Sequence, residues 1–151
     1  MAETGLFPTV KVPEFIENID NYDREYKPSL VWDLKAGDFA RTASGRVPYS
    51  EGKDAFQVWC VKCVATERLT CLAYADDIGS EMESAVKLND RKAVELAIRR
   101  TITEALMVNP RTQSVDEFTF EWEPDSVHVS FYVTGVDNDQ FELETDISTE
   151  G

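Results

Sequence analysis

Apolar residues in the second half of the chain recur first with the period of an α-helix and then with that of β-strands. Within residues 91–108 an apolar residue stands at every fourth position, and this stripe consists of Val94, Ile98, Ile102 and Leu106. The spacing places all four side chains on one face of a helix over 91–108. We expect this helix to end at Asn109-Pro110, because proline has no amide donor and restricts the residue before it.

Beyond this helix, apolar and polar residues alternate in three consecutive segments. They cover residues 118–122, 127–134 and 141–147, and turn-forming residues separate them. Alternation with a period of two is typical of strands that bury one face. The sequence therefore predicts a C-terminal three-stranded antiparallel meander whose apolar face packs on the long helix 91–108.

The pattern before the long helix predicts a β-hairpin and two further helices. Leu30, Trp32 and Leu34 alternate ahead of a turn at 36–38, and a return strand begins at Phe39. These elements, together with the long helix and the meander, define an α+β fold with two to three helices.

Serine residues mark the expected starts of the two shorter helices. Ser50 is a candidate N-cap for a helix that runs to about Glu67. Its apolar stripe consists of Phe56, Trp59, Cys60, Cys63 and Val64. Ser80 and Glu83 form an S-x-x-E capping box that is predicted to open a short helix.

The domain boundaries follow from where this periodicity begins and ends. Residues 1–27 show no sustained periodicity and are expected to form an extended N-terminal arm. Residues 28–147 hold all the predicted elements and form a single α+β domain, which leaves 148–151 as a short tail. The full length of 151 residues suits one domain with a sizeable core.

The charge of the chain excludes several classes of partner. Lys and Arg total 15 against 29 Asp and Glu, which gives a formal net charge of -14. Such a surface repels nucleic acid, anionic membranes and cell-wall polymers, so we expect neither nucleic acid nor membrane as a partner. No apolar run approaches the roughly 20 residues of a membrane span, and residues 1–10 lack the build of a signal peptide. We expect the chain to remain in the cytosol or to join an assembly made there.

Two cysteines offer the first candidate chemistry. Cys60 and Cys63 follow Trp59 in the W-C-x-x-C outline of a thiol-redox site, which requires the first thiol at a helix N-terminus. Here the helix is expected to begin several residues earlier, which favours two buried, inert thiols. Zinc binding by these two residues with Cys71 and His128 lacks a second ligand pair of the usual spacing, so no metal or cofactor is predicted.

An acid-based enzyme is the remaining catalytic alternative. His128 is the one histidine, and it has no orienting partner that the sequence reveals. Asp76-Asp77, Glu81 and Glu83 lie close together in the sequence, and a glycosidase or lysozyme-like enzyme would need one of them in an apolar pocket. The residue pattern singles out no such acid. We therefore assign no catalytic residue and keep a small acidic enzyme, either thiol-redox or glycosidase, as the alternative reading.

The last predicted strand offers a binding surface instead. Residues 112–151 carry eleven acids and no Lys or Arg, and several of these acids lie on this strand, where they would guard an open edge against self-pairing. The same edge would accept a strand from a less acidic partner by β-augmentation. The candidate residues are Gln140, Phe141, Glu142, Leu143, Glu144 and Thr145.

Three ordered stretches of the chain resemble one known family. Residues 30–34 with Gly37-Asp38-Phe39 are similar to its opening hairpin, and Thr66-Glu67-Arg68 with Tyr74 and Ile78-Gly79 is similar to the segment after its first helix. Asn109-Pro110-Arg111 resembles its Glu-Pro-Arg signature, with Asn109 in place of the glutamate. The family comprises the baseplate wedge and sheath-initiator proteins of contractile phage tails, typified by the T-even gene-twenty-five product. Its XkdS-like branch in PBSX-type prophages and tailocins is the nearer one.

The resemblance implies a structural role in a contractile tail. It implies that the chain links the wedge of the baseplate to the sheath and starts sheath assembly, in about six copies per baseplate. The partners implied are the tail sheath subunit and large wedge proteins, with tail tube or hub proteins as further candidates, and the location implied is the virion. The contact with the wedge is placed by resemblance at Asn109, Pro110 and Arg111. An Arg fixed after a proline suits bidentate pairing with a carboxylate, although a cation there also commonly closes its own helix.

Overall fold

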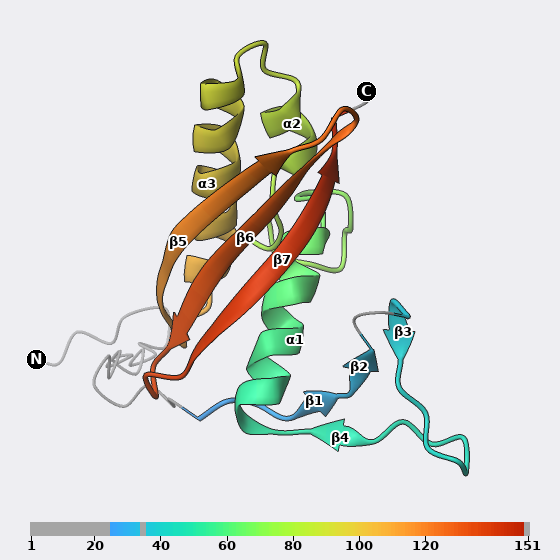
Figure 1. The fold of residues 1–151 in the computed structure, drawn as a ribbon. Helices are drawn as coiled ribbons and strands as arrows, with labels where there is room; N and C mark the ends of the chain where they lie inside the picture. Colours follow the sequence, from blue (N-terminus) through green and yellow to red (C-terminus); the bar gives the residue numbers. More distant parts are fainter. Residues whose placement is uncertain (1–24, 34–35, 150–151) are drawn as a thin grey trace, which may run out of the picture.

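A three-stranded sheet carries two long helices on one of its faces (Figure 1). The computed structural model describes residues 25–33 and 36–149, so most of the predicted arm, Leu34 and the end of the tail lie outside the described residues. The elements are β1 (Ser29–Leu30), β2 (Trp32–Asp33), β3 (Asp38–Phe39), β4 (Tyr49–Ser50), α1 (Gly52–Ala65), α2 (Met82–Val86), α3 (Arg91–Met107), β5 (Thr112–Trp122), β6 (Ser126–Gly135) and β7 (Gln140–Ser148).

The C-terminal meander is confirmed, with strand order β5-β6-β7 and antiparallel pairing throughout. Its first strand begins at Thr112, earlier than the alternation suggested. Thr112 is already buried, and its Oγ1 donates to the carbonyl of Leu106 at 2.7 Å. That bond joins the end of α3 directly to the start of β5, so the chain passes from helix to strand within the Asn109-Pro110-Arg111 corner.

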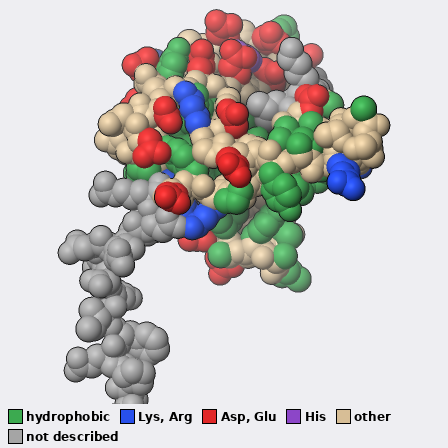
Figure 2. Space-filling model, turned by 90° about the horizontal axis from the view of Figure 1, so that it is seen from below, with side chains coloured by type: hydrophobic (Ala, Val, Ile, Leu, Met, Phe, Trp, Pro, Cys, Tyr) green, Lys and Arg blue, Asp and Glu red, His purple; other side chains and the backbone are tan. Residues whose placement is uncertain are grey.

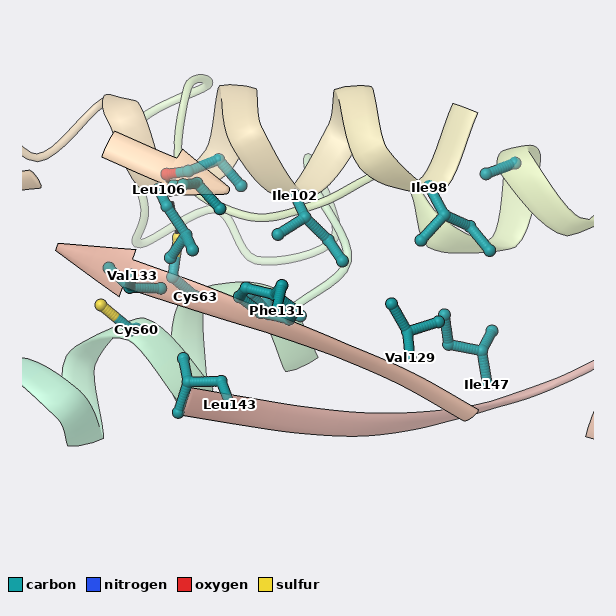
Figure 3. Close-up of a cluster of buried hydrophobic side chains, with 14 of the residues drawn as sticks. Cys60, Cys63, Ile98, Ile102, Leu106, Val129, Phe131, Val133, Leu143 and Ile147 are labelled. Atoms are coloured by element: carbon teal, nitrogen blue, oxygen red, sulfur yellow. Dashed lines mark hydrogen bonds between the residues drawn. The ribbon is translucent and has the colours of Figure 1, made fainter. Parts of the chain in front are cut away.

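The core lies between the sheet and the helices. Ile98, Ile102 and Leu106 are fully buried, and they face Val129 and Phe131 of β6, which confirms the predicted packing of α3 (Figure 3). The sequence predicted that α3 alone covers this face of the sheet, but α1 also packs on it through Cys60 and Cys63. Burying a side chain such as Phe131 contributes roughly 1.5–3 kcal/mol, so this layer dominates stability.

The segment before α1 forms two small antiparallel ribbons rather than one extended hairpin. Trp32 pairs with Phe39 across the β2–β3 turn, which confirms the predicted hairpin, and β1 pairs with β4 further along the chain. We refer to β1–β4 together as the β-arm. Lys62 of α1 holds its Nζ 4.7 Å from the Trp32 ring centroid and so ties the β-arm to the body.

Two predicted helix caps are wrong. Ser50 belongs to β4 and is buried, while Glu51 occupies the N-cap of α1. Ser80 does not cap α2 either, because its Oγ donates to the carbonyl of Val64 at 2.7 Å. Glu83 bonds Lys87 one helical turn later, at 2.7 Å, instead of reaching back to the serine. The long helix does have a side-chain cap, supplied by Asp90 to the amide of Ala93.

Candidate strand-binding edge and Pro-Arg corner

Strand β7 forms one edge of the sheet, and in the described part of the chain no strand pairs with its outer side. Its pairing with β6 runs through nine consecutive residue pairs without a register shift. Phe141, Leu143 and Ile147 are buried toward the helices, whereas Glu142 and Glu144 are exposed on the other face. The burial along this strand therefore alternates as the sequence pattern predicts.

The register also shows which backbone groups of β7 point toward the open edge. Bonds from the Gly135 amide to the Asp139 carbonyl and from the Thr149 amide to the Asp125 carbonyl, each 2.9 Å, fix the odd-numbered residues of β7 as those that bond β6. The amides and carbonyls of Glu142, Glu144 and Asp146 are therefore directed outward. Lys53 Nζ already meets the outward carbonyl of Gln140 at 3.2 Å.

A groove of about 370 Å³ runs beside this edge. One wall is β7 itself, and the other walls are α1 and the β-arm; the lining residues are Trp32, Gln57, Val61, Glu142, Leu143 and Glu144. A second hollow, of about 360 Å³, shares Trp32 and Gln57 with it and includes the buried Ser50. Figure 2, which views the molecule from below, shows hydrophobic side chains gathered on this end of the molecule among scattered acidic ones.

The face of the sheet away from the helices is acidic around His128. His128 Nδ1 lies 2.5 Å from Asp146 Oδ1 across the β6–β7 pair. The hydrogen bond to Asp146, with the nearby charges of Glu144 and Glu121, raises the pKa of His128 above its ordinary value. The single histidine therefore lies on the polar face of its strand, and it has an orienting carboxylate that the sequence did not reveal.

The Asn109-Pro110-Arg111 corner is rigid. The side-chain oxygen of Asn109 accepts from the Arg111 amide at 3.0 Å, which is a local turn typical of Asn before Pro. The Arg111 carbonyl in turn accepts from the Val136 amide at 3.0 Å, which joins the corner to the β6–β7 turn. Asn109 thus has a structural role at the position where the family signature has glutamate.

The start of the described chain packs against this corner. Arg111 Nε donates to the carbonyl of Glu25 at 2.5 Å. Tyr26 stacks on Phe56 with ring centroids 4.9 Å apart, and its hydroxyl would clash with any side chain at Gly135. Asn109 and Arg111 line the hollow between these segments, which measures about 300 Å³. The guanidinium therefore contacts the Glu25 carbonyl, while the Arg111 backbone is bonded to Asn109 and Val136.

A third feature, which we call the Arg68 clasp, was not predicted to be structural. Arg68 Nη2 and Nε donate to the Gly79 carbonyl at 3.1 and 3.3 Å, and its Nη1 pairs with Glu81 at 3.1 Å. Gly79 has φ +106°, and a Cβ there would lie 2.7 Å from the Thr66 carbonyl oxygen, so only glycine fits. The sequence hinted at this feature only through the family-like spacing of Arg68 and Gly79. The structure explains that spacing, because the two residues close the loop between α1 and α2.

Of the candidate catalytic groups, the two thiols are buried and Glu81 and Glu83 are paired, whereas Asp76 and Asp77 are exposed on the loop before α2. Cys60 and Cys63 are 0% and 4% exposed, and burial raises the pKa of both thiols, as expected for inert core cysteines. Glu81 and Glu83 engage Arg68 and Lys87, and the bond from Lys87 lowers the pKa of Glu83, the opposite of what a general acid requires. Within residues 25–33 and 36–149 no group of three metal-ligating side chains occurs.

Comparison with known proteins identifies the family. The model of the contractile injection system sheath initiator matches residues 28–139. The chain belongs to this family. A curated relative, the phage-like element PBSX protein XkdS of Bacillus subtilis (strain 168), is 30% identical over 97 residues, which cover 62% of this chain and 67% of the relative. Both matches confirm the resemblance inferred from the sequence.

This sheath initiator accordingly has a structural role in starting the sheath of a contractile tail, and it interacts with sheath and baseplate components. Its place is in the tail of a virion or phage-like particle. None of the helices in the described segments is long and apolar enough to cross a membrane. The matched region contains the β-arm, the Arg68 clasp, the Asn109-Pro110-Arg111 corner and most of the sheet, and it ends one residue before β7.

Proposed function

We propose that this sheath initiator binds the first sheath subunit by adding a strand of that subunit to β7, and binds a large wedge protein of the baseplate through Arg111. Six copies surround the tail axis in the baseplate, and the protein acts without catalysis. The observation that carries the proposal is the uninterrupted β7 edge, with outward backbone groups at Glu142, Glu144 and Asp146 beside a groove.

The other edge of the sheet does not suit an added strand. Strand β5 has two register shifts, between Thr112 and Ser114 and between Asp116 and Thr119. Glu117, within the second shift, has φ +55°, which turns the backbone out of the extended conformation. Bulges of this kind block edge-to-edge pairing. The sheath strand is therefore assigned to β7.

The proposal for β7 is tested with the full chain and the sheath subunit from the same tail. Glu144→Pro removes one outward amide and leaves the bonds to β6 in place, since proline is tolerated on the open side of an edge strand. Glu144→Ala removes the same carboxylate but keeps the amide. We expect the proline variant to weaken co-elution at least about tenfold relative to the alanine variant. Equal binding by both would contradict strand addition at β7.

The wedge contact is tested at Arg111. Its backbone is bonded to Asn109 and Val136, and its Nε to the Glu25 carbonyl, so the guanidinium is held in place before a partner carboxylate pairs with it. We expect Arg111→Ala to fold and to lose several-fold in affinity for the large wedge protein. Arg111→Lys keeps the charge but not the bidentate fork, and is expected to recover only part of the loss. Wild-type affinity in Arg111→Ala would remove the corner from the interface.

The non-catalytic assignment rests on the state of the candidate groups. The thiols are buried in the core and Glu81 and Glu83 are held by cations. Asp76 and Asp77 are exposed, rather than in the apolar pocket that a general acid requires. We expect no release of fragments from peptidoglycan at any concentration of this protein. Reproducible release that disappears on substitution of one named carboxylate would restore the enzyme alternative.

A further inference from the structure

The groove beside β7 has two chemically different sides. Toward the helices it presents Val61 of α1, Trp32 of the β-arm and Leu143, all wholly or partly buried. Toward the outer face of the sheet it presents the exposed carboxylates of Glu142 and Glu144, with Asp146 two residues further along. A segment lying in this groove therefore meets apolar contacts on one side and negative charge on the other.

Strand geometry converts this asymmetry into a sequence pattern. Residues directly opposite one another on neighbouring strands place their side chains on the same face of the sheet, about 4.5–5.5 Å apart at Cβ. An added residue opposite Glu142 or Glu144 thus points to the acidic face, and one opposite Leu143 points toward α1. Successive residues alternate between these faces. Like charges placed opposite one another destabilise the pair, so acidic residues are disfavoured on the outer side.

We propose that the strand received at β7 alternates basic and apolar residues, with Lys or Arg facing Glu142 and Glu144 and apolar side chains lying in the groove between β7, Val61 and Trp32. This inference rests on the proposed function and specifies the chemistry of its partner. It commits to a partner strand of opposite charge because the chain carries no Lys or Arg after Arg111. A second copy of β7 is excluded by its own acids, which would lie opposite those already there.

The β-arm has a defined part in this arrangement. It places Trp32 across the groove from β7, where Lys62 holds the ring by a cation–π contact. The arm is therefore a side wall of the strand site, and Trp32 contributes to the same site as Glu142, Leu143 and Glu144, more than 100 residues later in the sequence. Because the wall is formed by side chains, it selects by the size and polarity of every second residue in the partner.

Three labelled seven-residue peptides test the pattern against the full chain by fluorescence anisotropy. The first alternates Lys and Val, the second has Glu in place of each Lys, and the third has the composition of the first with its Lys residues in one block. We expect the first peptide to bind at least about tenfold more tightly than either of the others. Equal binding of the alternating and block peptides would overturn the inference, because charge alone would then explain the affinity.

Charge-swapped variants give the second arm of the test. Glu142→Lys with Glu144→Lys is expected to reverse the preference, so that the Glu peptide binds more tightly than the Lys peptide. The control, Asp76→Lys with Asp77→Lys, makes the same change in net charge on an exposed loop and is expected to keep the original preference. An unchanged preference in the β7 variant would contradict the pattern.

The groove wall is probed by Val61→Glu, which places a carboxylate where the apolar side chains are expected. Its binding of the alternating Lys-Val peptide should fall at least about tenfold. Gln57→Trp fills the groove from the same helix without adding a charge and should have the same effect. Full binding of the peptide by both variants would contradict the placement of its apolar side chains in the groove. If Glu144→Pro abolishes sheath binding but the peptides show no preference, the pattern is wrong and the proposed function stands.

Discussion

The two edge strands of the sheet differ although they flank the same central strand. β7 keeps a constant register with β6 for nine pairs, and the amides and carbonyls of Glu142, Glu144 and Asp146 point outward. β5 is broken by two register shifts and by the left-handed backbone of Glu117. In addition, Arg91 and Arg99 of α3 lie over the rings of Trp122 and Phe118 along β5. The difference shows how one sheet can be protected from self-association at one edge and receptive at the other.

The two edge strands can differ in this way only if both are held by one hydrophobic core. A large core-residue truncation tests whether they are. Phe131 lies at the centre of β6 and is 1% exposed. Phe131→Ala should lower the free energy of unfolding by about 3–5 kcal/mol, because it leaves a cavity beneath both edges. Urea denaturation measures the change. A loss below about 1 kcal/mol would mean that the edges do not share a single packed layer.

Thiol reactivity tests whether the helices cover the inner face of the sheet. Cys60 and Cys63 lie beneath the sheet with raised pKa values, whereas Cys71 is exposed on the loop between α1 and α2. One thiol should react at once with an aromatic disulfide in the native protein, and the other two only after denaturation. Rapid reaction of all three thiols, with Cys71→Ser as the control that removes the fast one, would show that the helices do not cover this face.

The irregularity of β5 is tested by Glu117→Gly. Glycine relieves a left-handed conformation that costs about 1–2 kcal/mol and loses about 0.5–1 kcal/mol of chain entropy, so stability should rise by no more than about 1.5 kcal/mol. Sheath binding should remain within about twofold of wild type, since β5 is not the receiving edge. A clear loss of sheath binding in this variant would move the interface from β7 to β5.

The smallest expected effect concerns pH at the β6–β7 pair. The pKa of His128 is raised in the folded chain, so the stabilisation from protonated His128 and Asp146 is present at low pH and is lost as pH rises through that raised value. Asp146→Asn should therefore reduce stability below about pH 6 more than above about pH 8. In an NMR titration the variant should lower the pKa of His128 part of the way, because Glu144 and Glu121 remain. An unchanged pKa of His128 in this variant would show that Asp146 does not interact with His128.

Much of this fold was predictable because its signals are local. The stripe at Val94, Ile98, Ile102 and Leu106 and the alternation in the meander depend only on neighbours along the chain, and both are confirmed. The caps at Ser50 and Ser80 were mispredicted for the opposite reason. Ser80 is held by the carbonyl of Val64, sixteen residues away, inside the Arg68 clasp. No local pattern reports such a contact.

The candidate site also has one part that was predictable from the sequence and one that was not. The acidic row of β7 follows from alternation, so its residues could be named from the sequence. The groove could not, because it depends on where the β-arm sets Trp32 relative to α1. The turn at Asn109 is intermediate: Asn before Pro signals a turn, but its bond to the Arg111 amide required the folded chain.

Hydrogen exchange at β7 detects an added strand residue by residue. Amide exchange is followed by NMR in the isolated full chain and in its complex with the sheath subunit. The amides of Glu142, Glu144 and Asp146 should exchange rapidly in the free protein and become protected in the complex, while those of Phe141 and Leu143 are protected in both. Complex formation that leaves the first three amides exchanging rapidly, or that protects β5 instead, would contradict strand addition at β7.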